Sequence, residues 1–128
     1  MLIKVDTNSQ QPIYEQVVQQ IKFAIAAGAF RTNEMIPSVR EISASLTINP
    51  NTIKKAFKIL QDEGIVYAKR GMGLAVTENA QEQCKQQRIE IFEKKIAQAF
   101  TEAIQSQLTP EELHRIVNEQ MNRNSFQT

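Results

Sequence analysis

Residues 49–60 have the sequence Asn49-Pro50-Asn51-Thr52-Ile53-Lys54-Lys55-Ala56-Phe57-Lys58-Ile59-Leu60. Asparagine is a favourable N-cap and proline a favourable first-turn residue, so the segment predicts a helix that runs to Glu63, before Gly64. At about 100° per residue, one face of this helix is apolar and the opposite face is basic. The apolar positions are Ile53, Ala56, Phe57 and Leu60, and the opposite face carries Asn51, Lys54, Lys55, Lys58 and Asp62. We therefore expect one face in a core and the other open to a polar partner.

A second helix is predicted immediately before this one. Ser38 and Glu41 have the spacing of a capping box, in which each side chain accepts from the backbone amide of the other residue. We expect the helix to end near Leu46, so that Thr47-Ile48 alone separate it from the Asn49 cap. Two helices joined by so short a turn predict a helix-turn-helix, whose second helix reads the major groove of DNA.

The flanking segments predict a supporting helix and a wing. Apolar residues recur at spacings of three and four between Pro12 and Gly28, which is typical of an amphipathic helix, and Met35-Ile36 fits a brief strand. Two short alternating segments, residues 65–68 and 73–76, flank a basic tip and predict a β-hairpin. The predicted fold class is mainly α with a small β wing (α+β). It is a winged helix-turn-helix over residues 1–76, followed by a helical dimerisation segment over residues 77–128.

The C-terminal segment predicts two further helices, one ending near Gln107 and one starting at Thr109-Pro110. Two helices cannot bury their apolar faces alone, because a piece of this size is too small for its own core. We expect these faces to form the interface of a homodimer, and packing on the chain's own winged domain is the alternative. The predicted interface residues are Ile89, Phe92, Ile96, Phe100, Leu113, Ile116 and Val117.

The charge balance differs between the two segments. Residues 1–76 hold nine basic and six acidic residues, whereas residues 77–128 hold six basic and eight acidic ones. Beyond the three lysines, the residues placed to contact backbone phosphate are Arg40 and the hairpin tip with Lys69 and Arg70. Gly71 lets that tip approach a sugar-phosphate strand without a Cβ atom, although it could simply form the turn.

Composition argues against several other classes. The apolar runs fall far short of the roughly 18 residues that cross a bilayer, and the amino terminus lacks a signal-peptide core, so we expect a cytoplasmic protein without membrane contact. A single cysteine and a single histidine cannot form a Cys/His metal cluster, and no phosphate loop or nucleophile elbow is present. We expect no metal, no cofactor and no catalysis. Cys84 could be a thiol sensor, but we favour a thiol without a functional role. His114 could be a metal ligand or a pH switch, but we favour a helix-surface residue. Tyr14 and Phe23 could line a ligand pocket, but we favour core packing.

Several segments, in order and at the right spacing, resemble the amino-terminal winged helix-turn-helix of GntR-family transcription regulators. These segments are Pro12–Gln16, Pro37–Glu41, Asn49–Ala56, Glu63–Ile65 and Gly71–Gly73. The resemblance covers roughly residues 10–76. It implies that seven residues in this range lie against DNA: Arg40, Asn49, Asn51, Thr52, Lys54, Arg70 and Gly71. This chain has Thr47 where the family usually has a glycine. Its short two-helix tail resembles the YtrA-like branch, which implies that it has no large effector-binding domain.

We predict a bacterial, sequence-specific transcription regulator, a repressor, that binds an inverted-repeat operator as a homodimer. Asn51 and Thr52 are the predicted base readers, and the basic residues are predicted to contact phosphate. The candidate DNA-binding residues are Ser38, Arg40, Asn49, Asn51, Thr52, Lys54, Lys55, Lys58, Lys69, Arg70 and Gly71. A winged-helix module that docks proteins without specific DNA binding is the alternative, and a small hydrolase with His114 as base is a third hypothesis. The operator, the regulated genes and any small-molecule effector cannot be derived from these residues.

Overall fold

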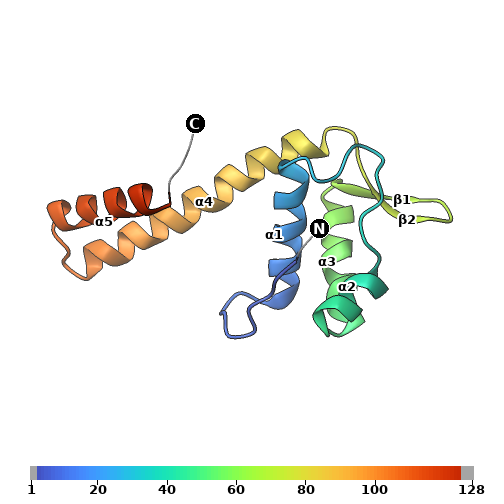
Figure 1. Ribbon diagram of the computed structural model, residues 1–128, viewed down its shortest axis with the longest axis horizontal. Helices are drawn as coiled ribbons and strands as arrows, with labels where there is room; N and C mark the ends of the chain where they lie inside the picture. The colour runs from blue at the N-terminus through green and yellow to red at the C-terminus, as the bar shows by residue number, and fades with distance from the viewer. Residues whose placement is uncertain (1–2, 125–128) are drawn as a thin grey trace. The chain divides into compact units, whose positions relative to one another are not determined.

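The structure is a computed structural model that describes residues 3–124. In that range the chain forms five helices and one two-stranded antiparallel sheet (Figure 1). The elements in chain order are α1 (Ile13–Ala26), α2 (Val39–Leu46), α3 (Pro50–Asp62), β1 (Val66–Lys69), β2 (Gly73–Val76), α4 (Ala80–Gln105) and α5 (Pro110–Arg123). The predicted fold class, mainly α with a small β wing, is confirmed.

The chain divides into two compact units, Met1–Ile89 and Glu90–Thr128. The first unit holds α1 to α3, the hairpin and the first turns of α4, whose Ala80 and Cys84 belong to its buried core. The second unit holds the rest of α4 and α5. The core of the first unit therefore extends beyond the hairpin, because the start of α4 supplies apolar side chains to it.

Helices α1 and α3 form the centre of the first unit. All four predicted apolar residues of α3 are buried, and Ile53 and Leu60 are 0% exposed. They share one cluster with Val17, Ile21 and Ile25 of α1, which are also 0% exposed. Each such side chain stabilises the fold by about 1.5–3 kcal/mol on burial. This core fixes which face of α3 turns outward.

The hairpin carries a short third segment at its edge. Strands β1 and β2 pair antiparallel with Val66 opposite Val76. Met35 forms an isolated antiparallel bridge with Ala75, which confirms the predicted brief extended segment. Asn33, just before it, has a left-handed φ of 69° and donates its amide to the Val76 carbonyl at 2.8 Å. The base of the wing is thus anchored to the chain that leads into α2.

Two glutamines of α1 hold the extended segment that precedes it. Gln16 accepts from the Asp6 amide at 2.8 Å and donates to the Asp6 carbonyl at 3.0 Å. Gln20, one turn later, makes the same pair of bonds with the backbone of Lys4. Since Ile3 is also buried, this segment is part of the packed unit.

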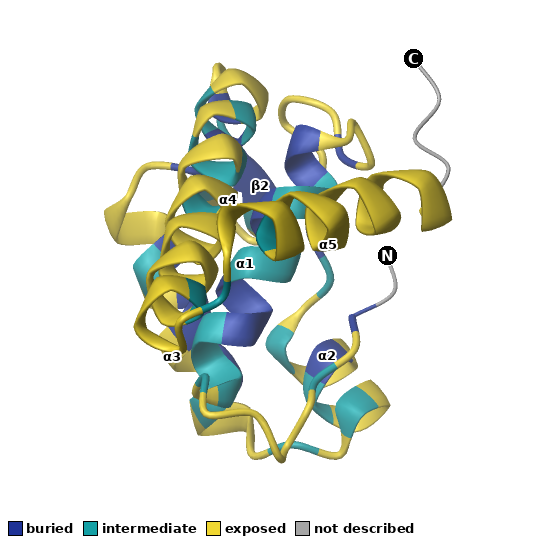
Figure 2. Cartoon of the chain, turned by 90° about the vertical axis from the view of Figure 1, so that its left-hand side faces the viewer, coloured by how far each residue is buried: buried dark blue, intermediate teal, exposed yellow. Residues whose placement is uncertain are grey.

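Most described residues of the second unit are exposed, and the ribbon of α5 is accordingly yellow (Figure 2). Helix α5 starts with the predicted capping box between Thr109 and Glu112 and with Pro110 in its first turn.

Among the described residues, no helix combines the length and apolar character needed to cross a membrane.

Candidate nucleic-acid interface

Helix α2 presents its start and its end to solvent. Ser38 Oγ accepts from the Glu41 amide at 3.0 Å, and the Glu41 carboxylate accepts from the Ser38 amide at 3.2 Å, so the predicted capping box is confirmed. Arg40, in the first turn, is exposed. Thr47 ends the helix with φ 53° and ψ 50°, a left-handed conformation that a β-branched residue adopts at a cost.

The amino-terminal turn of α3 carries the two predicted base readers. Asn49 caps the helix, and its side-chain oxygen accepts from the Asn51 amide at 2.9 Å. Asn51 is exposed and Thr52 is half-buried. The Asn49 oxygen is occupied by the helix cap, so of its side-chain polar groups only the amide nitrogen is left to meet a partner. The exposed Asn51 lies on the face of α3 opposite the buried apolar residues.

The three lysines of α3 are all exposed, as predicted, but they differ in their surroundings. Lys55 Nζ lies 3.9 Å from the centre of the Tyr14 ring, in cation–π contact with α1. Lys58 forms an exposed ion pair with Asp62 at 3.2 Å, one turn further along α3. Lys54 forms no ion pair within residues 3–124. Lys54 is therefore the least committed of the three positive charges.

The tip of the wing is basic and exposed. Arg70 is exposed, whereas Lys69 is half-buried and donates to the Asn33 carbonyl at 3.4 Å. Gly71 has φ 74° with open space where a Cβ would lie, and Gly73 has φ 125° with Met35 Cε 3.0 Å from that position. Both glycines are needed by the backbone of this turn, because side chains rarely adopt such angles. The backbone angles of the turn therefore explain both glycines, with or without a DNA strand nearby.

Helix α2, helix α3 and the wing border one hollow on the surface of the first unit. Val39 of α2, Lys54 and Lys58 of α3, and Leu74 of β2 all line it. Two further α3 residues, Gln61 and Asp62, lie on the same rim and were not among the sequence candidates. The basic face of α3 and the wing are thus parts of one surface, as the sequence analysis required.

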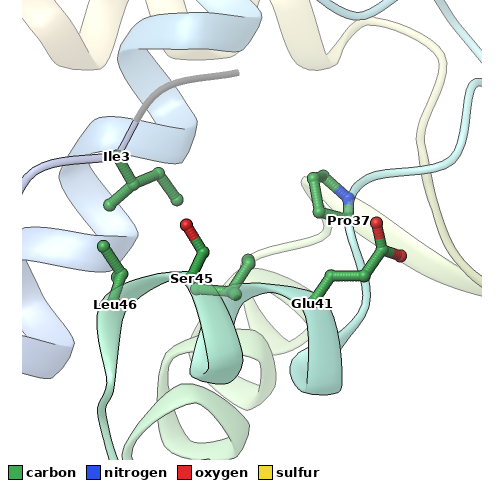
Figure 3. A pocket seen from close by; sticks show the side chains of 6 residues that line it. Ile3, Pro37, Glu41, Ser45 and Leu46 are labelled. Atoms are coloured by element: carbon green, nitrogen blue, oxygen red, sulfur yellow. The ribbon is translucent and has the colours of Figure 1, made fainter.

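A second hollow lies between the N-terminal segment and α2 (Figure 3). It measures about 290 Å³, just under the range of ordinary ligand pockets. Ile3 and Leu46 lie at one end of it, and Pro37 and Glu41 at the other. None of the candidate DNA-binding residues lines this hollow.

Two residues for which the sequence left alternatives are now placed. Cys84 is 0% exposed, and burial raises the pKa of its thiol to about 11, with Lys22 lowering the pKa and Glu63 raising it. Since the thiolate is the reactive form, this cysteine is a core residue and not a reactive thiol. His114 is exposed on α5.

The sequence also left two roles open for the aromatic residues of α1, a ligand pocket and core packing. Tyr14 is half-buried, packs against the core and lies under the Lys55 ammonium, and Phe23 is half-buried. The contact between Tyr14 and Lys55 was missed because a cation–π pair joins positions 41 residues apart in the sequence and leaves no local pattern. The pair between Lys58 and Asp62, by contrast, has the i,i+4 spacing that the sequence displays.

These features define a winged helix-turn-helix with an exposed basic recognition helix, a class of protein that binds double-stranded DNA. Comparisons with known proteins agree. Residues 13–76 match the family model described as bacterial regulatory proteins, gntR family. The chain is 34% identical to the HTH-type transcriptional repressor YtrA of Bacillus subtilis, over 92% of this chain and 91% of that protein.

Solved structures are similar in fold as well. A GntR family transcriptional regulator from Listeria monocytogenes superposes with a TM-score of 0.68 at 27% identity, covering 88% of this chain and 97% of that one. The DNA-binding domain of AraR in complex with an operator superposes with a TM-score of 0.52 at 28% identity, covering 58% of this chain and 92% of that one. The chain belongs to the GntR family and is a DNA-binding transcription regulator.

Proposed function

We propose that this protein is a repressor that binds an inverted-repeat operator as a homodimer, in the cytoplasm, and catalyses no reaction. One observation carries the proposal. The face of α3 opposite the core exposes Asn51, Lys54 and Lys58, and the wing borders the same surface. A helix in the major groove and a hairpin beside it would place these groups on bases and phosphates. The relative from Bacillus subtilis is named a transcriptional repressor, which supports repression.

Base recognition is assigned to the first turn of α3. Asn51 offers a carbonyl and an amide, the pair of groups that can bond to both the N6 and the N7 of adenine. Thr52, half-buried beside it, offers a hydroxyl and a methyl group. Ser38 and Asn49 also lie at helix starts, but their side-chain oxygens cap α2 and α3. We therefore propose that Ser38 and Asn49 contact DNA only through groups that leave these helix-capping hydrogen bonds intact.

Phosphate contact is assigned to the exposed basic residues, with unequal weight. Arg40, Lys54 and Arg70 form no ion pair within the described part of the chain, so they meet DNA without losing a partner. Lys58 must leave Asp62, an exposed pair worth about 0.2–1 kcal/mol. Lys55 is held over Tyr14 and Lys69 is bonded to a backbone carbonyl. We therefore expect the first three to contribute most to binding, and Gly71 to let the wing approach the strand.

The test of base recognition is Asn51→Ala, measured by electrophoretic shift on the DNA upstream of the protein's own gene and on random duplex. We expect a loss of about 1–3 kcal/mol on the cognate DNA and a smaller loss on random duplex. Gln10→Ala, which removes an exposed amide in the segment before α1, outside this surface, is the control and should bind as the unmodified protein does. Equal losses on both duplexes would refute a reading role for Asn51.

The test of phosphate contact is a salt titration of the same complexes. Lys54→Gln should reduce the slope of log affinity against log salt by about 0.9. Lys55→Gln should reduce it less, because that ammonium is already partnered by Tyr14. An affinity that does not change with salt concentration would favour the rival hypothesis, a winged-helix module that docks proteins.

The homodimer is supported by the exposure of the predicted interface residues. Ile96 is 57% exposed, Phe92 is 44% exposed, and Phe100, Ile116 and Val117 are each 38–39% exposed. Further apolar side chains, Ile104 and Met121, extend this surface and were not predicted. Ile89, at 51%, is exposed, and Leu113 is half-buried. Such a surface is covered most simply by a second copy, which would also present two recognition helices to a twofold operator.

The oligomeric state can be measured by sedimentation equilibrium. The unmodified chain should be a dimer and Ile96→Glu should be a monomer, because an interface carboxylate would lie unpaired against apolar residues. Lys94→Gln, which changes the charge of an exposed residue on the same helix, should remain a dimer. A monomeric unmodified chain would contradict the homodimer and leave the DNA-binding assignment to be judged on its own tests.

A further inference from the structure

Three elements of the first unit meet at Glu63, the residue that ends the recognition helix. Glu63 is the C-cap of α3, and its amide donates to the Ile59 carbonyl at 3.0 Å. Its carboxylate accepts from Lys22 of α1 at 2.8 Å. Its backbone carbonyl accepts from the Gln83 side chain of α4 at 3.1 Å. One residue therefore bonds the end of α3 to both neighbouring helices.

The two partners of the ion pair in this cluster differ in burial. The Lys22 side chain is 11% exposed and the Glu63 side chain is 37% exposed. An ammonium group withdrawn from water requires a fixed acceptor, so Lys22 holds the carboxylate in place. Neither side chain lies on the basic face of α3, so the cluster is separate from the proposed DNA contacts.

The start of α4 is attached to helix ends at two points. Gln83 donates to the C-cap carbonyl of α3, and Gln81 donates to the Ala26 carbonyl at the end of α1, at 3.5 Å. Carbonyls at helix C-termini lack partners within their own helix, so these side chains satisfy them. Cys84, the residue after Gln83, is buried in the core. The direction of the first turns of α4 is thus fixed against α1 and α3.

We propose that Glu63 is a positioning residue that, through Lys22 and Gln83, fixes the orientation of the recognition helix relative to the start of α4 and thereby sets the spacing between operator half-sites that the protein prefers. This inference rests on the proposed function, because α4 continues into the proposed dimer interface and the distance between two recognition helices fixes the half-site separation. The half-site sequence is read by the other end of α3, so spacing and base preference are controlled by different residues.

The experiment uses the full chain and synthetic duplexes. A half-site is first selected by the unmodified protein from a pool of random duplexes. Two inverted copies are then placed at a series of separations, and the affinity for each is measured. The variants are Gln83→Ala, which removes the bond to α4, and the pair Lys22→Met with Glu63→Met, which removes the ion pair without leaving a lone charge. Glu82→Gln is the control, since Glu82 is exposed and pairs with Lys85 of the same helix at 3.6 Å.

The unmodified protein and Glu82→Gln should prefer one separation. Each cluster variant should lose at least about threefold of that preference over the neighbouring separations, with the selected half-site sequence unchanged. Thermal unfolding identifies any variant that fails to fold, and Gln83→Ala, altered at a half-buried position, keeps the test decisive if the double variant is unfolded. An unchanged separation profile in folded variants overturns the inference alone. Failure of the unmodified protein to select any duplex overturns the proposed function together with it.

Discussion

Thr47 is the position at which a single substitution should increase stability. It ends α2 with φ 53° and ψ 50°, in the left-handed region. This conformation costs an L-residue roughly 1–2 kcal/mol because of its Cβ atom, whereas glycine adopts it freely. Thr47→Gly also increases the entropy of the unfolded chain, which costs about 0.5–1 kcal/mol. We expect a net gain of about 1 kcal/mol in the free energy of unfolding.

The substitution should remove nothing else. Thr47 is exposed, and the bond that closes α2 at this point comes from its backbone amide to the Ser43 carbonyl, which glycine retains. For a unit the size of Met1–Ile89, a gain of about 1 kcal/mol raises the melting temperature by about 4–8 °C. Circular dichroism during heating and during urea titration measures both quantities.

Thr47→Ala is the matched control. Alanine loses the branched side chain but keeps the Cβ atom that makes the left-handed region unfavourable, so its stability should lie close to that of the unmodified protein. A gain with alanine equal to that with glycine would show that the threonine side chain, and not the backbone angle, is responsible. No gain with glycine would refute the claim that strain is stored in this turn.

Three other predictions concern groups outside the DNA surface. Cys84, with a pKa raised to about 11 and no exposed surface, should react with a disulfide reagent at neutral pH far more slowly in the native protein than in denaturant; equal rates would contradict its burial. The bond from the Thr109 backbone lowers the pKa of Glu112, so the capping box stabilises α5 above the ordinary pKa and loses this contribution as the pH falls through the lowered one. Helical signal should decline in that acidic window, and Glu112→Gln, which has no carboxyl group to titrate, should abolish the pH dependence. Gln16→Ala should destabilise the first unit by about 1–3 kcal/mol and speed hydrogen exchange at the Asp6 amide, because it leaves that backbone group unpaired; unchanged exchange would show that Gln16 does not hold the segment.

Much of the recognition surface could be predicted because its signals are local. The Ser38 capping box, the proline in the first turn of α3 and the period of its apolar residues each lie within about one to three turns of helix. These short-range rules placed α2 and α3 within one residue of their observed ends. They also predict that Lys54 lies on the exposed face of α3, as it does.

The sequence by itself therefore determined where α2 and α3 begin and end, which face of α3 is apolar, and where the hairpin turns. Only the tertiary structure decided which polar and charged side chains have partners on other elements. Lys55 meets Tyr14, Lys22 meets Glu63, and Gln83 meets the end of α3, although these partners are 20 to 41 residues apart. Side-chain periodicity describes a single element, whereas a contact between elements depends on how their cores pack, and that packing brought these groups together.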